Sequence, residues 1–160
     1  LLAWWLGPAL AAAQPADCLP LTPSGTQGAA LLPGGLMNVR HGGTADAPLQ
    51  LDVYPHADAS PRPLALVLRG GRGTVGQRAS YVGQLIELFG DAGYVVAVAD
   101  YRSGAAVQAA ADVTSALRML TQCHASTLRI DQYRTVLVAE DSAASVAMGV
   151  AADLLRRRQG

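Results

Sequence analysis

The sequence predicts a three-layer α/β fold, in which helices cover both faces of a mostly parallel sheet. Short, continuous apolar runs such as residues 64–68 and 94–99 have the length and composition of strands that are covered on both faces. Segments with helical periodicity separate these runs. Parallel neighbours need such crossovers, which are right-handed, so the order strand, helix, strand indicates helices on both sides of one sheet.

The first strand and the first helix are predicted from local patterns. Residues 49–54 alternate between apolar and polar side chains, as a strand does, and the buried run at 64–68 follows a proline. Ser80 can cap a helix whose apolar positions recur at helical spacing as far as Phe89, and the glycines that follow end it.

The second half of the chain repeats this alternation. A buried strand is expected at residues 94–99 and an alanine-rich helix at 105–123. A third buried strand is expected at 136–139, and the last helix runs from about 143 to 158.

The first 48 residues are expected to precede this pattern. Residues 1–13 are apolar and end in three alanines, which fits the core and cleavage site of a secretory signal that is too short for a stable membrane span. Residues 14–48 are rich in Pro, Gly, Thr and Ala and are interpreted as an extended leader and loop region, with a turn at 41–43. Residues 49–160 then form the folded domain, and we expect the protein to be secreted or periplasmic.

Composition narrows the class of protein. The chain has 160 residues, of which 51% are hydrophobic, which is enough for one buried core. Its 12 acidic and 12 basic residues cancel, so no electrostatic footprint for nucleic acid is present, and no cofactor or metal is predicted. Cys18 and Cys123 can form a disulfide in an oxidising compartment or remain free buried thiols, and the sequence leaves both open.

The chemistry is expected where the strand at 136–139 turns into the last helix. A hydroxyl at such a corner is exposed, has helix amides behind it, and can attack a carbonyl. Ser142 is therefore the candidate nucleophile, in an elbow with Glu140, Asp141 and Ala144. Small residues are wanted two before and two after the serine, whereas Glu140 is long and charged. The alternative is that Ser142 only caps the helix.

The order of these segments resembles the α/β-hydrolase fold, in particular the esterase and lipase branch related to hormone-sensitive lipase. Residues 51–55 are similar to its opening strand, and 66–73 stand where its His-Gly-Gly-Gly-Trp loop belongs. Residues 92–102 resemble its following strand, and 130–145 lead into its Gly-Asp/Glu-Ser-Ala-Gly-Gly elbow. The resemblance covers residues 38–155 and implies a serine carboxylic ester hydrolase acting on a small-molecule ester.

The resemblance places the oxyanion hole in the Gly-rich loop and at the start of the last helix. The candidate donors are the backbone amides of Gly70, Gly71, Arg72 and Ala143. The loop carries Arg69 and Arg72, and the elbow Glu140 and Ala144, in place of family residues. These departures keep open a noncatalytic, degenerate protein of the same fold.

The acid and base of the implied triad are expected beyond this chain. In this fold they follow the serine in the order Asp or Glu, then His. No histidine follows Ser142, and His41, His56 and His124 are interpreted as surface residues. We therefore expect residues 49–160 to be the N-terminal half of a hydrolase domain, truncated before the triad acid and base and inactive alone.

A dinucleotide-binding oxidoreductase is the alternative outside this fold. Residues 71–76 read Gly-x-Gly-x-x-Gly after a strand, and Asp100 ends the next strand. In that fold the helix begins within the glycines, whereas the cap at Ser80 predicts a later start. The hydrolase interpretation is preferred, because it also accounts for the elbow at Ser142.

Overall fold

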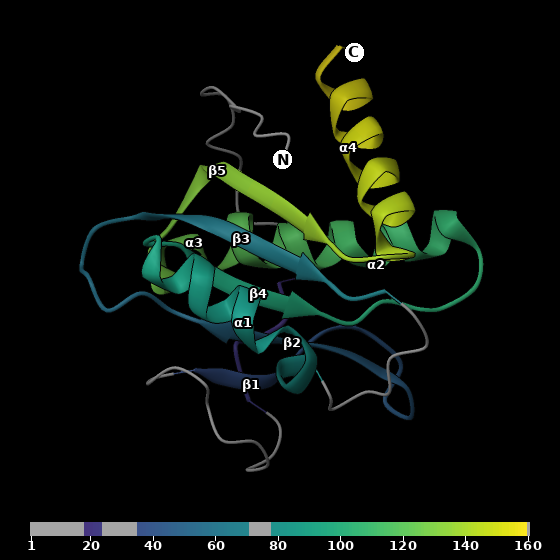
Figure 1. Cartoon of the computed structure of the whole chain (residues 1–160). Coiled ribbons are helices and arrows are strands. Elements are labelled where there is room, and N and C mark those ends of the chain that lie inside the picture. Colours follow the sequence, from purple (N-terminus) through teal and green to yellow (C-terminus); the bar gives the residue numbers. More distant parts are fainter. Residues whose placement is uncertain (1–17, 24–34, 71–77, 160) are drawn as a thin grey trace.

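The computed structural model describes residues 18–23, 35–70 and 78–159. In this part of the chain, one five-stranded sheet has the strand order β1-β2-β4-β3-β5 (Figure 1). The predicted signal-like segment, 1–13, lies outside the described residues. The strands are β1 (Leu36–Gly43), β2 (Pro48–Tyr54), β3 (Arg62–Leu68), β4 (Val95–Ala99) and β5 (Ile130–Ala139). The helices are α1 (Arg78–Asp91), α2 (Ala106–Arg118), the π-helical turn η1 (Met119–Cys123), α3 (Ala125–Leu128) and α4 (Ala143–Gln159).

The strand directions confirm the prediction of a mostly parallel sheet. β3 pairs in parallel with β4 on one side and with β5 on the other. β2 pairs antiparallel with β4, and β1 pairs antiparallel with β2, so that β2 runs against all the other strands. Because β3, β4 and β5 are parallel, the loops that follow them meet at one edge of the sheet.

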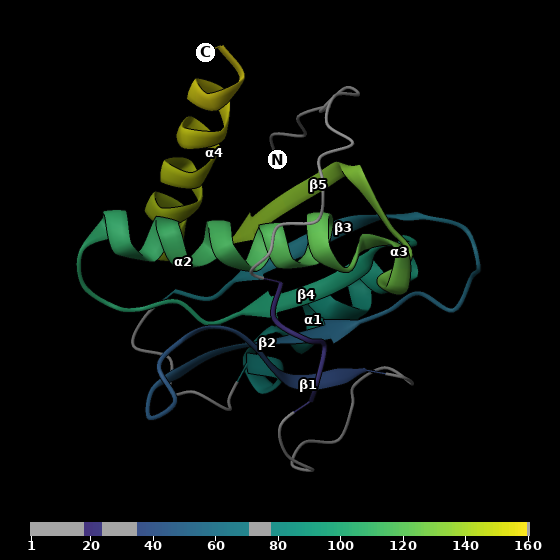
Figure 2. The same cartoon turned by 180° about the vertical axis from the view of Figure 1, so that it is seen from behind.

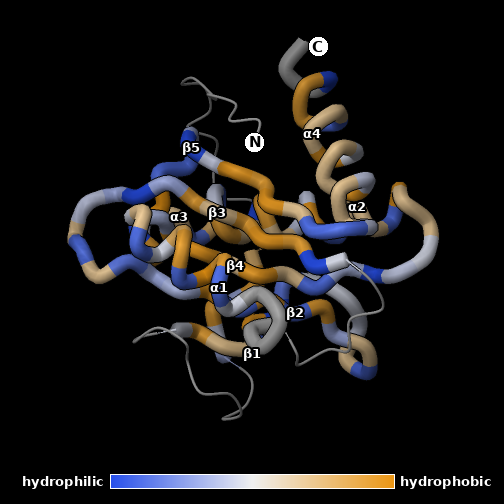
Figure 3. The backbone as a smooth tube through the Cα atoms, viewed as in Figure 1, coloured by the Kyte–Doolittle hydropathy of each residue, from blue (hydrophilic) through white to orange (hydrophobic). Residues whose placement is uncertain are grey.

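Helices cover both faces of the sheet, which confirms the three-layer prediction. α1 lies against one face (Figure 1), and α2 lies across the other, with α4 rising beside it from the end of β5, as the reverse view shows (Figure 2). Leu66 and Ala97 join the core beneath α2 and α4, whereas Val67 and Val98 join the core beneath α1. The central strands are therefore apolar at successive positions (Figure 3). Within the described ranges, no helix combines the length and apolar character needed to cross a membrane.

One strand was not predicted. β1 lies within residues 14–48, where the sequence indicates only leader and loop, and the predicted turn at 41–43 is wrong because these residues end the strand. Its pairing with β2 is broken by register shifts, and Asn38 has a φ of 54°. These irregularities interrupt the alternation by which a strand is recognised in a sequence.

α1 begins at Arg78, so Ser80 lies inside the helix and the predicted cap at Ser80 is wrong. Two other elements also differ from their predicted bounds. β5 begins at Ile130 rather than 136, and its first half carries Asp131 and Arg134, whose carboxylate and guanidinium lie 2.7 Å apart. β5 is the last strand in the sheet order, where charged side chains are tolerated. The helix expected at 105–123 ends in the wider turn η1, in which His124 N donates to the carbonyl oxygen of Met119 at 3.0 Å.

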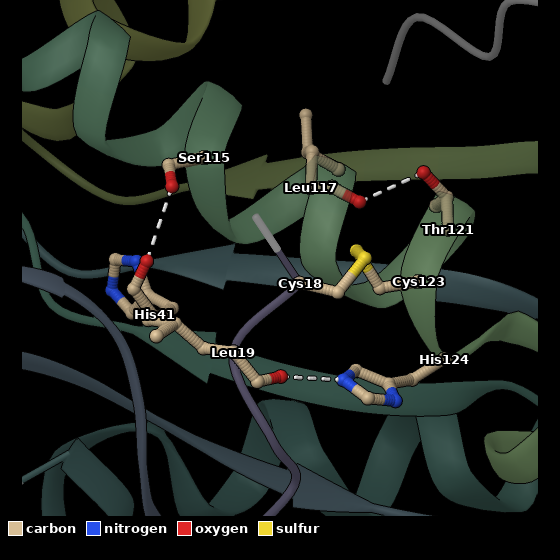
Figure 4. The surroundings of a disulfide bond; sticks show 8 residues. All are labelled: Cys18, Leu19, His41, Ser115, Leu117, Thr121, Cys123 and His124. Carbon is tan, nitrogen blue, oxygen red and sulfur yellow. Dashed lines mark hydrogen bonds between the residues drawn. A yellow bond between two sulfur atoms is a disulfide. The ribbon is translucent and has the colours of Figure 1, made fainter. Parts of the chain in front are cut away.

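Cys18 and Cys123 form a disulfide, which decides the alternative that the sequence leaves open (Figure 4). Their Cα atoms are 5.7 Å apart. Beside the bond, the His124 Nε2 atom lies 2.7 Å from the carbonyl oxygen of Leu19 and forms a hydrogen bond with it. Together these contacts hold the segment around Cys18 against η1.

Candidate active site

A tight corner joins β5 to α4. The Glu140 N–H donates to the carbonyl oxygen of Leu68 at 3.2 Å, which extends the pairing with β3 past the end of the strand. The Ala143 N–H then donates back to Glu140 O at 3.1 Å, and the next amide donates to Asp141 O at 3.0 Å. The side chain of Ser142 is exposed at this corner, whereas Ala143 is fully buried.

The residue with left-handed backbone is Asp141, whose φ is 51°. Aspartate is one of the few residues other than glycine that tolerate this region, because its short polar side chain can hydrogen-bond locally. The bend therefore lies one residue before Ser142, and the positions two before and two after it are Ala139 and Ala143. Both are small, and Glu140 stands outside these two positions.

Gly70 packs directly against the corner. A Cβ atom added to it would stand 2.8 Å from Ser142 N and 3.0 Å from the Cβ of Asp141, and nearer still to the carbonyl oxygen of Glu140. Real Cβ atoms do not approach backbone atoms this closely, so only glycine fits here. The structure thus brings together the candidate nucleophile and the first of the predicted oxyanion residues.

The structure does not place the other predicted donors, Gly71, Arg72 and Ala143, ready to bind an oxyanion. Gly71 and Arg72 lie outside the described residues, as does the rest of the predicted Gly-x-Gly-x-x-Gly segment. The Ala143 N–H donates inside the turn to Glu140 O, so it can serve an oxyanion only by sharing or releasing that bond. Of the predicted donors, Gly70 is therefore the one that the structure describes and that no contact reported above engages inside the turn.

The loop after β4 reaches the same edge of the sheet. Tyr101 donates its hydroxyl hydrogen to the carbonyl oxygen of Arg69 at 2.6 Å. The Nε and Nη2 atoms of Arg102 donate to the carboxylate of Asp112 on α2 at 2.9 Å and 2.7 Å. The backbone N–H of Arg102 donates to the same carboxylate at 2.9 Å. Arg102 therefore serves as a structural partner of Asp112, and Tyr101 adds a contact with the predicted oxyanion loop.

The pKa values of Asp112 and Tyr101 are both shifted, for different reasons. Burial alone would raise the pKa of Asp112, but the hydrogen bonds and the charge of Arg102 outweigh it and hold that pKa below its usual value. Burial raises the pKa of the Tyr101 phenol. Asp112 is therefore charged at neutral pH, and Tyr101 keeps the hydrogen that it donates.

Each histidine forms a hydrogen bond with a backbone group outside the corner. His41 is buried on β1, contrary to the surface position predicted for it, and its Nε2 atom lies 3.0 Å from the carbonyl oxygen of Asp100 at the end of β4. His56 Nδ1 accepts a hydrogen bond from the Asp58 N–H at 3.2 Å. His124 precedes β5 and lies at the end opposite Ser142.

The chain was compared with protein-family models, curated proteins and solved structures. No protein-family model and no curated protein matches the chain. Among solved structures, it is similar to esterase 2 from the Planctomycetes species Thermogutta terrifontis, with a TM-score of 0.59 and 25% identity over 72% of this chain and 43% of that one. The chain has part of an α/β-hydrolase fold.

Two further structures of that esterase match this partial α/β-hydrolase fold. The propionate-bound form has a TM-score of 0.59 and 25% identity over 72% of this chain and 44% of that one. The form phosphorylated by paraoxon has a TM-score of 0.55 and 26% identity over 68% and 44% of the two chains. The chain spans less than half the length of these esterase chains, and its place in the hormone-sensitive-lipase branch stays a prediction.

Substituting Gly70 tests the packing of the corner. We expect Gly70→Ala to lower the free energy of unfolding by about 1–3 kcal/mol, because the new methyl group would overlap backbone atoms of the elbow. Chemical denaturation with urea measures this change. The control is Gly149→Ala in α4, where a Cβ would meet only the Cβ of Ala110 at 3.7 Å.

In that control, alanine is expected to leave stability unchanged or to raise it by about 0.5–1 kcal/mol, because it favours the helix more than glycine does. Equal stability of Gly70→Ala and the original protein would contradict the close approach of Gly70 to the elbow.

Proposed function

We propose that the protein carrying this chain is a serine carboxylic ester hydrolase of esterase or lipase type, with Ser142 as nucleophile. The observation that carries the proposal is the close approach of Gly70 to the backbone of the Ser142 corner, since it places a predicted oxyanion donor beside the candidate nucleophile. The fold shared with a known esterase supports it. The triad acid and base are proposed to come from a part of the protein outside this chain.

The proposed reaction begins at Ser142. The Oγ of Ser142 attacks the ester carbonyl carbon and gives its proton to the base, and the carbonyl oxygen becomes an oxyanion. The Gly70 loop donates backbone hydrogen bonds to that oxygen, each of which typically contributes about 3–4 kcal/mol to lowering the barrier. The alcohol then leaves with the proton, and water hydrolyses the acyl-serine.

The proposed substrate is a small-molecule ester with a short acyl chain. The similar esterase from Thermogutta terrifontis has been obtained with propionate bound, which is the acid product of such an ester. The proposed location is secreted or periplasmic. The disulfide between Cys18 and Cys123 supports it, because such bonds persist in oxidising compartments.

A noncatalytic protein of the same fold is the second candidate. The observations that favour it are the left-handed residue at Asp141 instead of Ser142, and the use of the Ala143 amide inside the turn. Both place the elbow in an arrangement that differs from the one expected for a serine at the bend itself.

Covalent trapping separates the two candidates. The full-length protein is treated with paraoxon, digested, and sequenced by mass spectrometry. We expect a phosphoryl adduct on Ser142, because an activated serine attacks the phosphorus atom and expels p-nitrophenol. An unmodified Ser142 would favour the noncatalytic protein. Thermal stabilisation by NAD or NADP in the same preparation would favour the dinucleotide-binding alternative.

A further inference from the structure

The side chain of Tyr101 joins two loops at the carboxyl edge of the sheet. Its hydroxyl lies 2.6 Å from the carbonyl oxygen of Arg69, although the residues are 32 positions apart in the sequence. Arg69 follows β3, and Tyr101 follows β4, which pairs with β3 in parallel. The contact therefore spans neighbouring strands just where the predicted oxyanion loop begins.

The bonded oxygen belongs to the same rigid unit as a predicted oxyanion donor. The carbonyl of Arg69 and the N–H of Gly70 are the two ends of one peptide group, which is planar and resists rotation by about 18–20 kcal/mol. A hydrogen bond that fixes the direction of the carbonyl also fixes the direction of the N–H. Tyr101 therefore acts on the orientation of the Gly70 amide without touching it.

Gly70 needs this external support. Glycine has the freest backbone of all residues, so its own torsion angles do little to hold the loop. On one side the elbow limits its movement, because Glu140 and Ser142 leave no room for even a methyl group. On the other side, the hydrogen bond from Tyr101 holds the carbonyl group of the preceding residue, Arg69.

Tyr101 is itself held firmly. The next residue, Arg102, binds Asp112 through its backbone N–H and through two guanidinium nitrogens. Asp112 is 6% exposed and lies on α2, which packs on the main core. The bidentate geometry fixes the loop after β4 to that helix and so fixes the position from which Tyr101 reaches Arg69.

We propose that Tyr101 is a positioning residue for ester hydrolysis: its hydroxyl holds the Arg69–Gly70 peptide group so that the Gly70 N–H serves the oxyanion formed at Ser142. This inference rests on the proposed function. It predicts that the hydroxyl acts on the transition state, where the oxyanion exists, rather than on the binding of the ester.

The test compares Tyr101→Phe with the original full-length protein, using p-nitrophenyl butyrate. We expect kcat to fall by about 10- to 100-fold and KM to change by less than about twofold, because an interaction made only in the transition state is weakened. The matched control is Tyr133→Phe on β5, which removes the same hydroxyl at the amino-terminal half of that strand. It is expected to leave both constants unchanged.

The outcomes separate this inference from the proposed function. Unchanged kcat in Tyr101→Phe, with Ser142 still trapped by paraoxon, would overturn the positioning role alone. A fall in kcat that matches only the loss of folded protein, measured by thermal unfolding, would overturn it as well. If the original protein neither hydrolyses the ester nor reacts with paraoxon at Ser142, the proposed function is wrong, and the positioning role of Tyr101 is wrong as well.

Discussion

Replacing Ser142 with alanine is expected to lower kcat for a p-nitrophenyl ester by about 10⁴- to 10⁶-fold in the full-length protein. Without the Oγ atom no acyl-serine can form, and the rate that remains comes from binding and from the oxyanion donors. The effect on stability is expected to be small, at most about 1 kcal/mol, because Ser142 is exposed and the largest loss would be that of a helix cap. Steady-state kinetics and urea denaturation measure the two quantities separately.

Two further variants distinguish a nucleophile from a helix cap. Asparagine caps a helix as well as serine does but forms no acyl intermediate, so Ser142→Asn should keep the stability and lose the activity. Ser145→Ala, one turn further along α4, removes an exposed hydroxyl that donates to the carbonyl oxygen of Ser142 at 3.0 Å. It should stay active. Normal turnover in Ser142→Ala would reject this residue as the nucleophile.

The central part of the fold is predictable because burial on both faces leaves a simple pattern. β3 and β4 read as continuous apolar runs, since successive side chains enter opposite cores. β1 gives no such pattern, because bulges shift its register and only Val39 and His41 are buried among its residues. The first half of β5 is hard to recognise in the sequence for another reason. An edge strand accepts charged residues, so it lacks a continuous apolar run.

The site is predictable in part, and mostly through the resemblance of motifs. The strand-to-helix corner at Ser142 and the approach of Gly70 follow from the order of segments. The left-handed position of Asp141 depends on the backbone path and leaves no periodic signal. The bond from Tyr101 to Arg69 was also missed, because contacts between a side chain and a distant carbonyl leave no spacing to detect. A polar-tipped aromatic residue just after a buried strand is the one available signal.

The disulfide couples the N-terminal segment to the main core over a long stretch of chain. Cys18 and Cys123 are 105 positions apart, so the bond closes a loop that includes every strand except β5. In the chain-entropy model, closing a loop of about 100 residues removes enough freedom from the unfolded state to stabilise the folded one by about 4.7 kcal/mol. The folded state also keeps the hydrogen bond from His124 to Leu19 beside it.

The double variant Cys18→Ala with Cys123→Ala is therefore expected to lose about 4 kcal/mol of unfolding free energy, a large share of the stability of an ordinary domain. Urea denaturation of the oxidised protein and of the variant measures the difference. The original protein treated with dithiothreitol should match the variant, and the variant itself should not respond to the reductant. A loss of unfolding free energy below about 1 kcal/mol would contradict this prediction. It would mean that the disulfide restricts the unfolded chain very little, as it would if Cys18 and Cys123 already lie close together in the unfolded state.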